Sequence, residues 1–147
     1  MEFRHALEWV SAYYAAVRCT EADKSRLQEC YVCLQAAHDE KLFEQETRAD
    51  ADFHLAIAEA SHNAVLLHTM RSLFTLLHKN IYANLESVYP KRDTRERIHD
   101  QHKVLLEAIV AGDPEMARNA AHDHLAFVEE AIIEQRKEST RLERAMR

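Results

Sequence analysis

The sequence predicts an all-α protein, an antiparallel bundle of about six helices, and three observations support this prediction. Only one glycine and two prolines occur in 147 residues. Sheet-rich folds need many turn glycines, whereas long helices with short connections need almost none. Apolar residues recur at helical spacing along most of the chain. In addition, Gly112-Asp113-Pro114-Glu115 has the residue order of a tight turn between two helices.

Each expected helix is bounded by residues that favour a helix end. Thr20 suits the N-cap of the second helix, with Asp23 at its N3 position. Ser61-His62-Asn63 separates the third helix from the fourth, and Pro90 with the charged residues after it ends the fourth. The expected helices cover about residues 2–19, 20–38, 42–60, 64–88 and 94–111, and a sixth begins at about residue 114 and frays towards the C-terminus.

The first helix carries apolar residues at helical spacing, which predict the side that it buries. These residues are Leu7, Val10, Tyr14 and Val17. At this length, and without an internal repeat or a linker, the whole chain (residues 1–147) is expected to form a single domain.

Composition and charge exclude several classes of protein. Hydrophobic residues make up 47% and charged residues 30%, which is too apolar for a disordered chain. The net charge of −6 and the lack of a basic stripe argue against direct phosphate or nucleic-acid binding. Basic residues in the last turns are interspersed with glutamates. Without a long apolar run or a signal-peptide pattern, the sequence predicts a cytoplasmic protein that does not contact membranes.

The three cysteines, Cys19, Cys30 and Cys33, do not form an even disulfide framework. Cys30 and Cys33 make a CxxC pair, but it lies within a predicted helix and lacks a second pair. A zinc knuckle or redox motif is therefore disfavoured, and free thiols in a reducing compartment are expected.

The ten histidines differ in their position on the predicted helices. In the fifth helix His102 lies on the apolar stripe of Ile98, Leu105 and Ile109. His99 shares another face with charged residues and is expected to be solvated.

In the sixth helix His124 lies on the stripe of Ala117, Ala121, Val128 and Ile132, whereas His122 points elsewhere. In the third helix Asp50 and His54 form an i, i+4 pair on a strip with Ile57 and Ser61. No role is assigned to the remaining histidines. His68 and His78 lie among leucines, in half-buried positions.

Three helices thus direct an imidazole or a carboxylate at the core. Any one of these histidines alone is explained as an ordinary core residue with a hydrogen-bond partner. Burying all of them together costs several kcal/mol unless something pairs them, and one divalent cation does so at once. The candidate metal ligands are Asp50, His54, His102 and His124. Three nitrogens and one oxygen suit zinc, with nickel, manganese and iron as alternatives.

Three stretches of the chain resemble the FCD ligand-binding domain, the C-terminal half of FadR-type transcription factors of the GntR superfamily. The stretches are Glu2-Phe3-Arg4-x-x-Leu7-Glu8, Asp50-x-x-Phe53-His54-x-x-Ile57-x-x-Ala60-Ser61-x-Asn63, and His102-x-x-Leu105-x-x-Ala108-Ile109-x-x-Gly112-Asp113 with Ala117 and His124-Leu125. Within that family, Phe53 to Asn63 and the following Ala64-Val65-Leu66-Leu67-His68 look most like lactate-responsive and pyruvate-responsive repressors.

The resemblance implies the same four metal ligands that the helical stripes select. It also implies a small carboxylate effector that coordinates the metal, a homodimer, and a first-helix arginine near the effector, which maps to Arg4. The alternative for Arg4 is a structural ion pair with Glu8, one turn further on. Members of the family carry an N-terminal winged-helix domain that binds DNA. Nothing in this sequence resembles that domain, so the chain is expected to be an effector domain that reaches DNA only through it.

Three functions compete at this point. The favoured one is a non-enzymatic sensor in which a 2-hydroxy or 2-oxo acid, such as lactate or pyruvate, biases a dimer and thereby controls DNA binding of the full-length repressor or activator. A metal-dependent helical-bundle hydrolase or oxygenase is the main alternative, because a bound metal with an open position can activate water. Against it, no second carboxylate is evidently placed as a general base, and no catalytic residue is assigned. The third is a helical dimerisation module.

Overall fold

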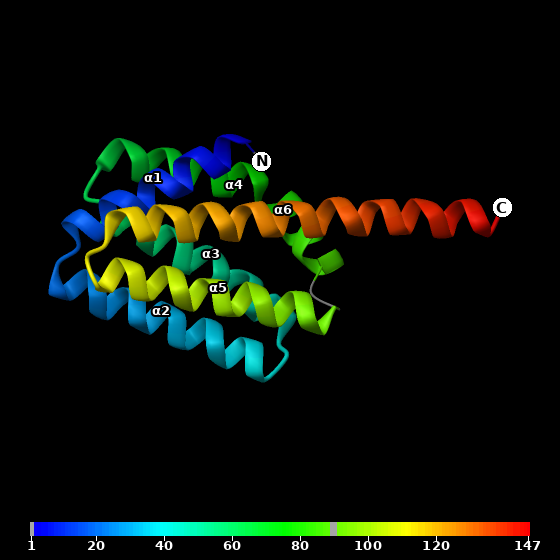
Figure 1. Cartoon of the computed structure of the whole chain (residues 1–147), viewed down its shortest axis with the longest axis horizontal. Coiled ribbons are helices and arrows are strands. Elements are labelled where there is room, and N and C mark those ends of the chain that lie inside the picture. Colours follow the sequence, from blue (N-terminus) through cyan, green and yellow to red (C-terminus); the bar gives the residue numbers. More distant parts are fainter. Residues whose placement is uncertain (1, 89–90) are drawn as a thin grey trace.

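The computed structural model of the chain describes residues 2–88 and 91–147, and between residues 77 and 88 it describes only the side chains of Lys79, Ala83 and Glu86. Within these residues the chain forms six α-helices and no strand, which confirms the all-α prediction. The helices are α1 (Glu2–Arg18), α2 (Glu21–Asp39), α3 (Phe43–Ala60), α4 (Ala64–Val88), α5 (Arg92–Val110) and α6 (Pro114–Ala145). Successive helices run in opposite directions (Figure 1).

Two of the predicted helix ends have the expected capping geometry. The Thr20 hydroxyl accepts a hydrogen bond from the Asp23 backbone N–H, and the Asp23 carboxylate accepts one from the Thr20 N–H, which completes a capping box. Gly112 has a φ of +70°, and the Asp113 side chain accepts from the Met116 N–H. The turn between α5 and α6 therefore needs glycine at this point, because other residues rarely adopt a positive φ.

The last two helices differ from the prediction at one end each. Helix α5 begins at Arg92 rather than near residue 94, and Arg92 forms an ion pair of 2.9 Å with Glu96 across its first turn. Helix α6 does not fray but continues to Ala145. Its last turns are rich in Arg, Lys, Glu and Leu, which have high helix propensity. Its C-terminal half projects beyond the bundle (Figure 1). Pro90, expected to end α4, lies outside the described residues.

The predicted buried face of α1 is not the face that the helix buries most deeply, although Leu7 and Val10 pack against an apolar cluster that contains Met70 and Phe74. Val17 is 57% exposed, and Leu7, Val10 and Tyr14 are only partly buried. The face that α1 buries instead consists of Arg4, Glu8, Ser11, Ala12, Ala15 and Ala16. Small residues let neighbouring helices approach closely. The alanine face of α1 is therefore the one that packs most tightly against its neighbours.

Helices α3 and α6 each pack against several others. Helix α3 packs against α1, α2 and α4, while α6 packs against α1, α5 and α4. Two apolar clusters lie within the bundle, one containing Phe53, Ile57 and Leu105, and the other containing Met70 and Phe74. No helix in the described part of the chain combines the length and the apolar composition needed to cross a membrane.

Candidate metal centre

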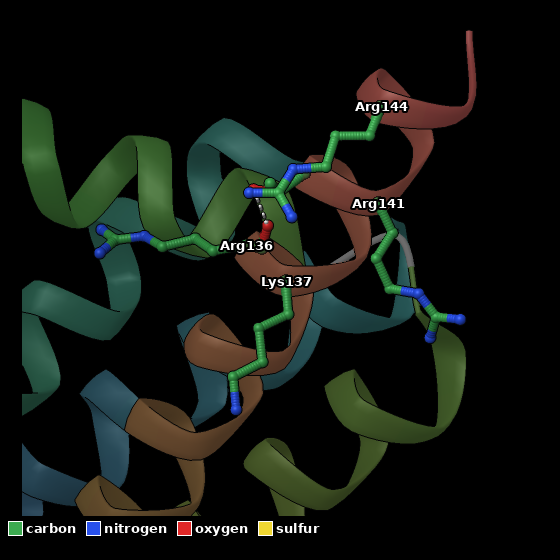
Figure 2. A pocket seen from close by; sticks show the side chains of 5 residues that line it. Arg136, Lys137, Arg141 and Arg144 are labelled. Atoms are coloured by element: carbon green, nitrogen blue, oxygen red, sulfur yellow. Dashed lines mark hydrogen bonds between the residues drawn. The ribbon is translucent and has the colours of Figure 1, made fainter. Parts of the chain in front are cut away.

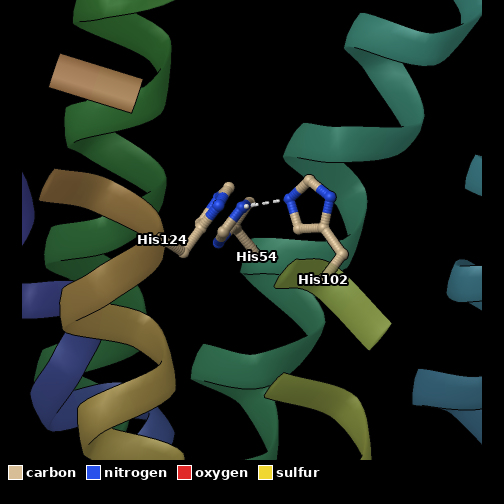
Figure 3. A group of neighbouring side chains, drawn as sticks. All are labelled: His54, His102 and His124. Atoms are coloured by element: carbon tan, nitrogen blue, oxygen red, sulfur yellow. Dashed lines mark hydrogen bonds between the residues drawn. The ribbon is translucent and has the colours of Figure 1, made fainter. Parts of the chain in front are cut away.

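Three buried histidines from three helices meet in the interior of the bundle. His54 of α3, His102 of α5 and His124 of α6 place possible ligand atoms within 4.8 Å of one another (Figure 3). The Nε2 atoms of His54 and His102 are 3.2 Å apart. The helical stripes predicted each of the three to point inward, and their burial confirms that prediction.

The carboxylate of Asp50 lies beside two of these imidazoles. Its Oδ1 is 2.9 Å from Nε2 of His102 and 3.7 Å from Nε2 of His54. Asp50 and His54 are one turn apart on α3, so the same face of that helix presents both groups. The structure therefore brings the four predicted residues to one place.

Two further polar side chains, which the sequence reasoning did not assign, contact the outer nitrogens of the histidines. Glu8 Oε2 is 3.0 Å from Nδ1 of His54, and Gln101 Oε1 is 3.0 Å from Nδ1 of His124. Each oxygen accepts the Nδ1–H, so Nε2 is the ring nitrogen that remains for a cation in both histidines. The i, i+4 spacing of Arg4 and Glu8 was the one sequence signal for Glu8; Gln101 gave none.

Aromatic rings enclose the centre on two sides. Phe53, from one apolar cluster, contacts the rings of His54 and His102 edge-on, with centroids 5.8 and 5.5 Å away. Phe74, from the other cluster, stacks near His54 at 6.5 Å. The surroundings are therefore apolar, and electrostatic interactions among the buried groups are stronger than at the surface.

The electrostatics of the centre are dominated by burial and by two carboxylates. Burial alone raises the pKa of a carboxyl group, but Arg4 and His54 outweigh it and lower the pKa of Glu8 to about 2. His54 and His102 likewise hold the pKa of Asp50 well below its usual value. Burial lowers the pKa of His54, yet Glu8 and Asp50 raise it to about 9.

The pKa of His124 shifts in the opposite direction to that of His54, because burial and the neighbouring His102 and His54 hold it well below the ordinary value. Its imidazole is therefore neutral, which is the form that binds metal.

These residues fit a divalent metal ion. Two nitrogen or oxygen ligands held 2.1 Å from one cation are separated by roughly 3.0–3.4 Å in octahedral or tetrahedral geometry. The separations of 3.2, 2.9 and 3.7 Å among His54, His102 and Asp50 bracket this range. Two ligands also have a hydrogen-bonded outer nitrogen, as metal-binding histidines usually do.

Arg4, the predicted effector-binding residue, is one step removed from the histidines. Its Nε donates to Glu8 Oε1 at 2.6 Å, and its guanidinium lies 5.3 Å from the centre of the Phe74 ring. The pair is buried, with side chains 6% and 3% exposed. The structural ion pair considered for Arg4 is thus present, and it connects Arg4 through Glu8 to His54.

Two predictions about the remaining histidines were wrong. His99 is partly buried rather than solvated, because its ring stacks between Tyr31 and His38. His68 is exposed. His122 is exposed as predicted and contacts His5. The side chain of His78 lies outside the described residues.

His38 belongs to a separate polar cluster. Its Nδ1 lies 3.0 Å from Glu46 Oε1, and Arg95 donates to its backbone oxygen at 2.7 Å. The cysteines are free thiols, as expected.

A shallow basic hollow on the projecting end of α6 does not form a second site. Its lining residues are Arg136, Lys137, Thr140, Arg141 and Arg144. The guanidinium groups of Arg136 and Arg141 point in opposite directions (Figure 2). Nearby, Glu138 pairs with Lys91 at 2.8 Å. The basic side chains therefore do not converge on one anion, which agrees with the sequence-based expectation.

The matches to known proteins all indicate the same family. The family model for the FCD domain matches residues 1–127. An Escherichia coli (strain K12) protein named for regulation of the L-lactate dehydrogenase operon is 40% identical over 128 residues, covering 87% of this chain and 48% of its own length. The Glc operon transcriptional activator of the same strain is 33% identical over 135 residues, covering 90% and 53%. The HTH-type transcriptional regulator LutR of Bacillus subtilis (strain 168) is 32% identical, covering 90% and 60%.

The chain spans about half the length of the curated relatives it matches. Among solved structures, Escherichia coli McbR/YncC has the same fold, with a TM-score of 0.73 at 23% identity over 94% of this chain and 63% of that chain. Because the family model covers most of the residues and the bundle matches a solved relative, this chain belongs to the FCD domain family.

Proposed function

We propose that this chain is the metal-dependent sensing domain of a transcription regulator of the GntR/FadR type. It binds a small 2-hydroxy or 2-oxo acid, such as lactate or pyruvate, and thereby sets the DNA binding of the longer protein. One observation carries the proposal: three imidazoles place possible ligand atoms within 4.8 Å of one another in the core, and the Asp50 carboxylate lies 2.9 Å from one of them. The relatives named as operon regulators support the regulatory part.

The four core side chains would hold the cation. Asp50, His54 and His102 contribute atoms 2.9 to 3.7 Å apart, and His124 completes the set. A bound divalent cation supplies Lewis acidity and open positions for a carboxylate oxygen and an adjacent hydroxyl or keto oxygen. Zinc is the favoured metal, with nickel, manganese or iron as alternatives.

Arg4 would recognise the charge of the effector. A guanidinium carries five N–H donors, so the bond from Nε to Glu8 is compatible with a second, forked contact to a carboxylate. Its burial strengthens such a contact, because surrounding water does not screen it. Arg4 therefore binds the effector while Glu8 keeps it close to His54.

Catalysis has less support than sensing. A hydrolase needs a carboxylate free to act as a base on metal-bound water. Glu8 is the additional buried carboxylate at the centre, but its two oxygens accept hydrogen bonds from Arg4 and His54. The named relatives are regulators. A sensor releases its ligand unchanged, which distinguishes it from an enzyme.

The same proposal includes the partners and the setting of the longer protein. We expect it to act as a homodimer in the cytoplasm and to contact DNA through an N-terminal winged-helix domain, outside residues 1–147. Effector binding shifts the relative populations of two dimer arrangements, because a ligand favours the state that binds it better.

Thermal unfolding with added acids tests the sensor directly. A ligand at about one hundred times its dissociation constant stabilises a fold by about 2.7 kcal/mol, or several degrees. We expect L-lactate, D-lactate or pyruvate at millimolar concentration to raise the Tm of the metal-loaded domain. Acetate should raise it less, because it lacks the second oxygen donor.

Two variants separate the roles of the residues. Arg4→Ala should lose most of the acid-induced shift but keep the metal, whereas His54→Ala should lose both. If Arg4→Ala responds to the acid like the parent, Arg4 is not in the effector site. If no hydroxy or keto acid changes the Tm of the metal-loaded parent, the proposed ligand class is wrong.

A further inference from the structure

One buried carboxylate, that of Glu8, links the proposed effector residue to a proposed metal ligand. Its Oε1 accepts from Nε of Arg4 at 2.6 Å, and its Oε2 accepts from Nδ1 of His54 at 3.0 Å. The Glu8 side chain is 3% exposed. Both oxygens are thus engaged, one by each neighbour, so Glu8 is fixed in place and its charge is shared between them.

The contact to His54 determines which nitrogen faces the centre. Because Nδ1–H donates to Glu8, Nε2 is the nitrogen that faces His102 and Asp50, which lie 3.2 and 3.7 Å away. A carboxylate behind a metal-binding imidazole fixes its orientation and increases its basicity. Glu8 is therefore a positioning residue for His54.

Comparison with the second outer contact shows that orientation alone does not require a carboxylate. At His124 the neutral amide oxygen of Gln101 accepts the Nδ1–H at the same distance, 3.0 Å. An amide can therefore orient a histidine at this centre. The negative charge at position 8 needs another explanation, and the neighbouring guanidinium of Arg4 provides one.

The buried charges around the centre nearly balance. Arg4 and Glu8 cancel each other, and metal-binding imidazoles are neutral. The charge of Asp50 offsets half that of a divalent cation, which leaves one net positive charge. Glu46, one turn before Asp50 on α3, is balanced separately by Arg95, whose Nε is 3.9 Å from its carboxylate, and it also contacts His38. In an apolar interior, an unbalanced second charge is strongly disfavoured.

Building on the proposed function, we propose that Glu8 both positions His54 and sets the charge selectivity of the effector site. By neutralising Arg4, Glu8 leaves the metal-loaded site with a single positive charge, which one monocarboxylate balances and a dicarboxylate overcompensates. The site therefore takes singly charged 2-hydroxy or 2-oxo acids and rejects those with a second carboxylate.

Lactate and hydroxymalonate are matched probes, because they share the 2-hydroxy acid group and differ by a methyl or a second carboxylate. Binding of each acid to the zinc-loaded protein is measured by calorimetry, and zinc affinity by competition with a chromophoric chelator. We expect the parent to bind lactate at least about tenfold more tightly than hydroxymalonate, since an unbalanced buried charge weakens binding.

Glu8→Gln keeps an oxygen that can accept from His54 but removes the charge. Its zinc affinity should stay within about tenfold of the parent, while its preference for lactate over hydroxymalonate should fall at least about tenfold. Glu8→Ala removes both functions, and its zinc affinity should fall by about 10–100-fold, as for other outer contacts of metal ligands. Glu96→Gln, in the exposed i, i+4 pair with Arg92 on α5, is the matched control and should leave both properties unchanged.

The possible results separate the two roles of Glu8 from the proposed function on which they rest. An unchanged lactate preference in Glu8→Gln, with lactate still bound, overturns the selectivity role alone. Parent-like zinc affinity in Glu8→Ala overturns the positioning role. If that variant does not fold, a fall of more than about tenfold in the zinc affinity of Glu8→Gln overturns it, because the amide oxygen still accepts from His54. A zinc-loaded parent that binds neither acid overturns the proposed function and the selectivity with it.

Discussion

A buried imidazole is stable only when its two ring nitrogens have compatible partners. His54 and His124 each donate from Nδ1 to a side-chain oxygen, Glu8 in one case and Gln101 in the other. Their remaining nitrogens and that of His102 converge. One cation satisfies these three nitrogens and the carboxylate of Asp50 better than protons do, because the imidazoles cannot all be charged in an apolar interior.

The ligand set can be tested residue by residue. His102→Ala and His124→Ala should each lose most of the bound metal and lower the Tm, since metal binding contributes to folding free energy. His99→Ala and His122→Ala should keep a full equivalent, because His99 stacks with Tyr31 and His38 and His122 is exposed. Elemental analysis of the purified variants gives the metal content. A full equivalent in His102→Ala would remove that residue from the set, and metal loss in His122→Ala would add one.

At the scale of the helix, α1 has two faces that composition alone does not rank. Its larger apolar residues are partly exposed, while Ala12 and Ala15 are completely buried. The alanines bring α1 close to α6 and α3, and on the same face, nearer the N-terminus, Arg4 and Glu8 reach the metal centre. The small side chains thus let a charged pair from α1 reach a histidine of α3.

Overpacking this face should be costly. Ala15→Leu adds three carbon atoms at a position with 0% exposure, and should lower the free energy of unfolding by about 1–3 kcal/mol. Val17→Leu on the opposite side, where Val17 is 57% exposed, should change it by less than about 0.5 kcal/mol. Urea denaturation followed by circular dichroism measures both. Equal midpoints for Ala15→Leu and the parent would mean that α1 does not pack through this face.

On the scale of the whole molecule, the centre joins distant parts of the chain. Its side chains come from α1, α3, α5 and α6, with Arg4 and His124 at opposite ends of the sequence. A ligand that contacts both Arg4 and the metal ligands would change the interactions of several helices at once. This arrangement suits a domain that converts binding into a shift between two arrangements of a dimer.

The proposed dimer can be tested in solution. Sedimentation equilibrium at micromolar concentration should give a mass of about twice 17.1 kDa, because a two-state sensor needs an interface whose arrangement the effector can bias. A concentration series, with and without chelator, separates weak association from dependence on metal. A species of 17.1 kDa alone across the series would contradict a dimer formed by this domain.

Local sequence features determined the helices and most of their ends. The capping box of Thr20 and Asp23 and the left-handed Gly112 act within a few residues, so the sequence is sufficient to predict them. The inward direction of His102 and His124 also followed from the sequence, because each lies on an apolar stripe, and that of His54 followed from the strip that it shares with Asp50 and Ile57. Periodicity along one helix fixes which side is buried when that side is unambiguous.

The tertiary structure alone decided which residues contact the outer nitrogens of the proposed metal ligands. Glu8 and Gln101 contact histidines on other helices, and His99 is covered by the rings of Tyr31 and His38 from α2. These contacts depend on how closely the helices approach and on the rotation of each about its axis. On α1, apolar residues on one side and alanines on the other left that rotation undetermined, and close packing of the alanine face settled it.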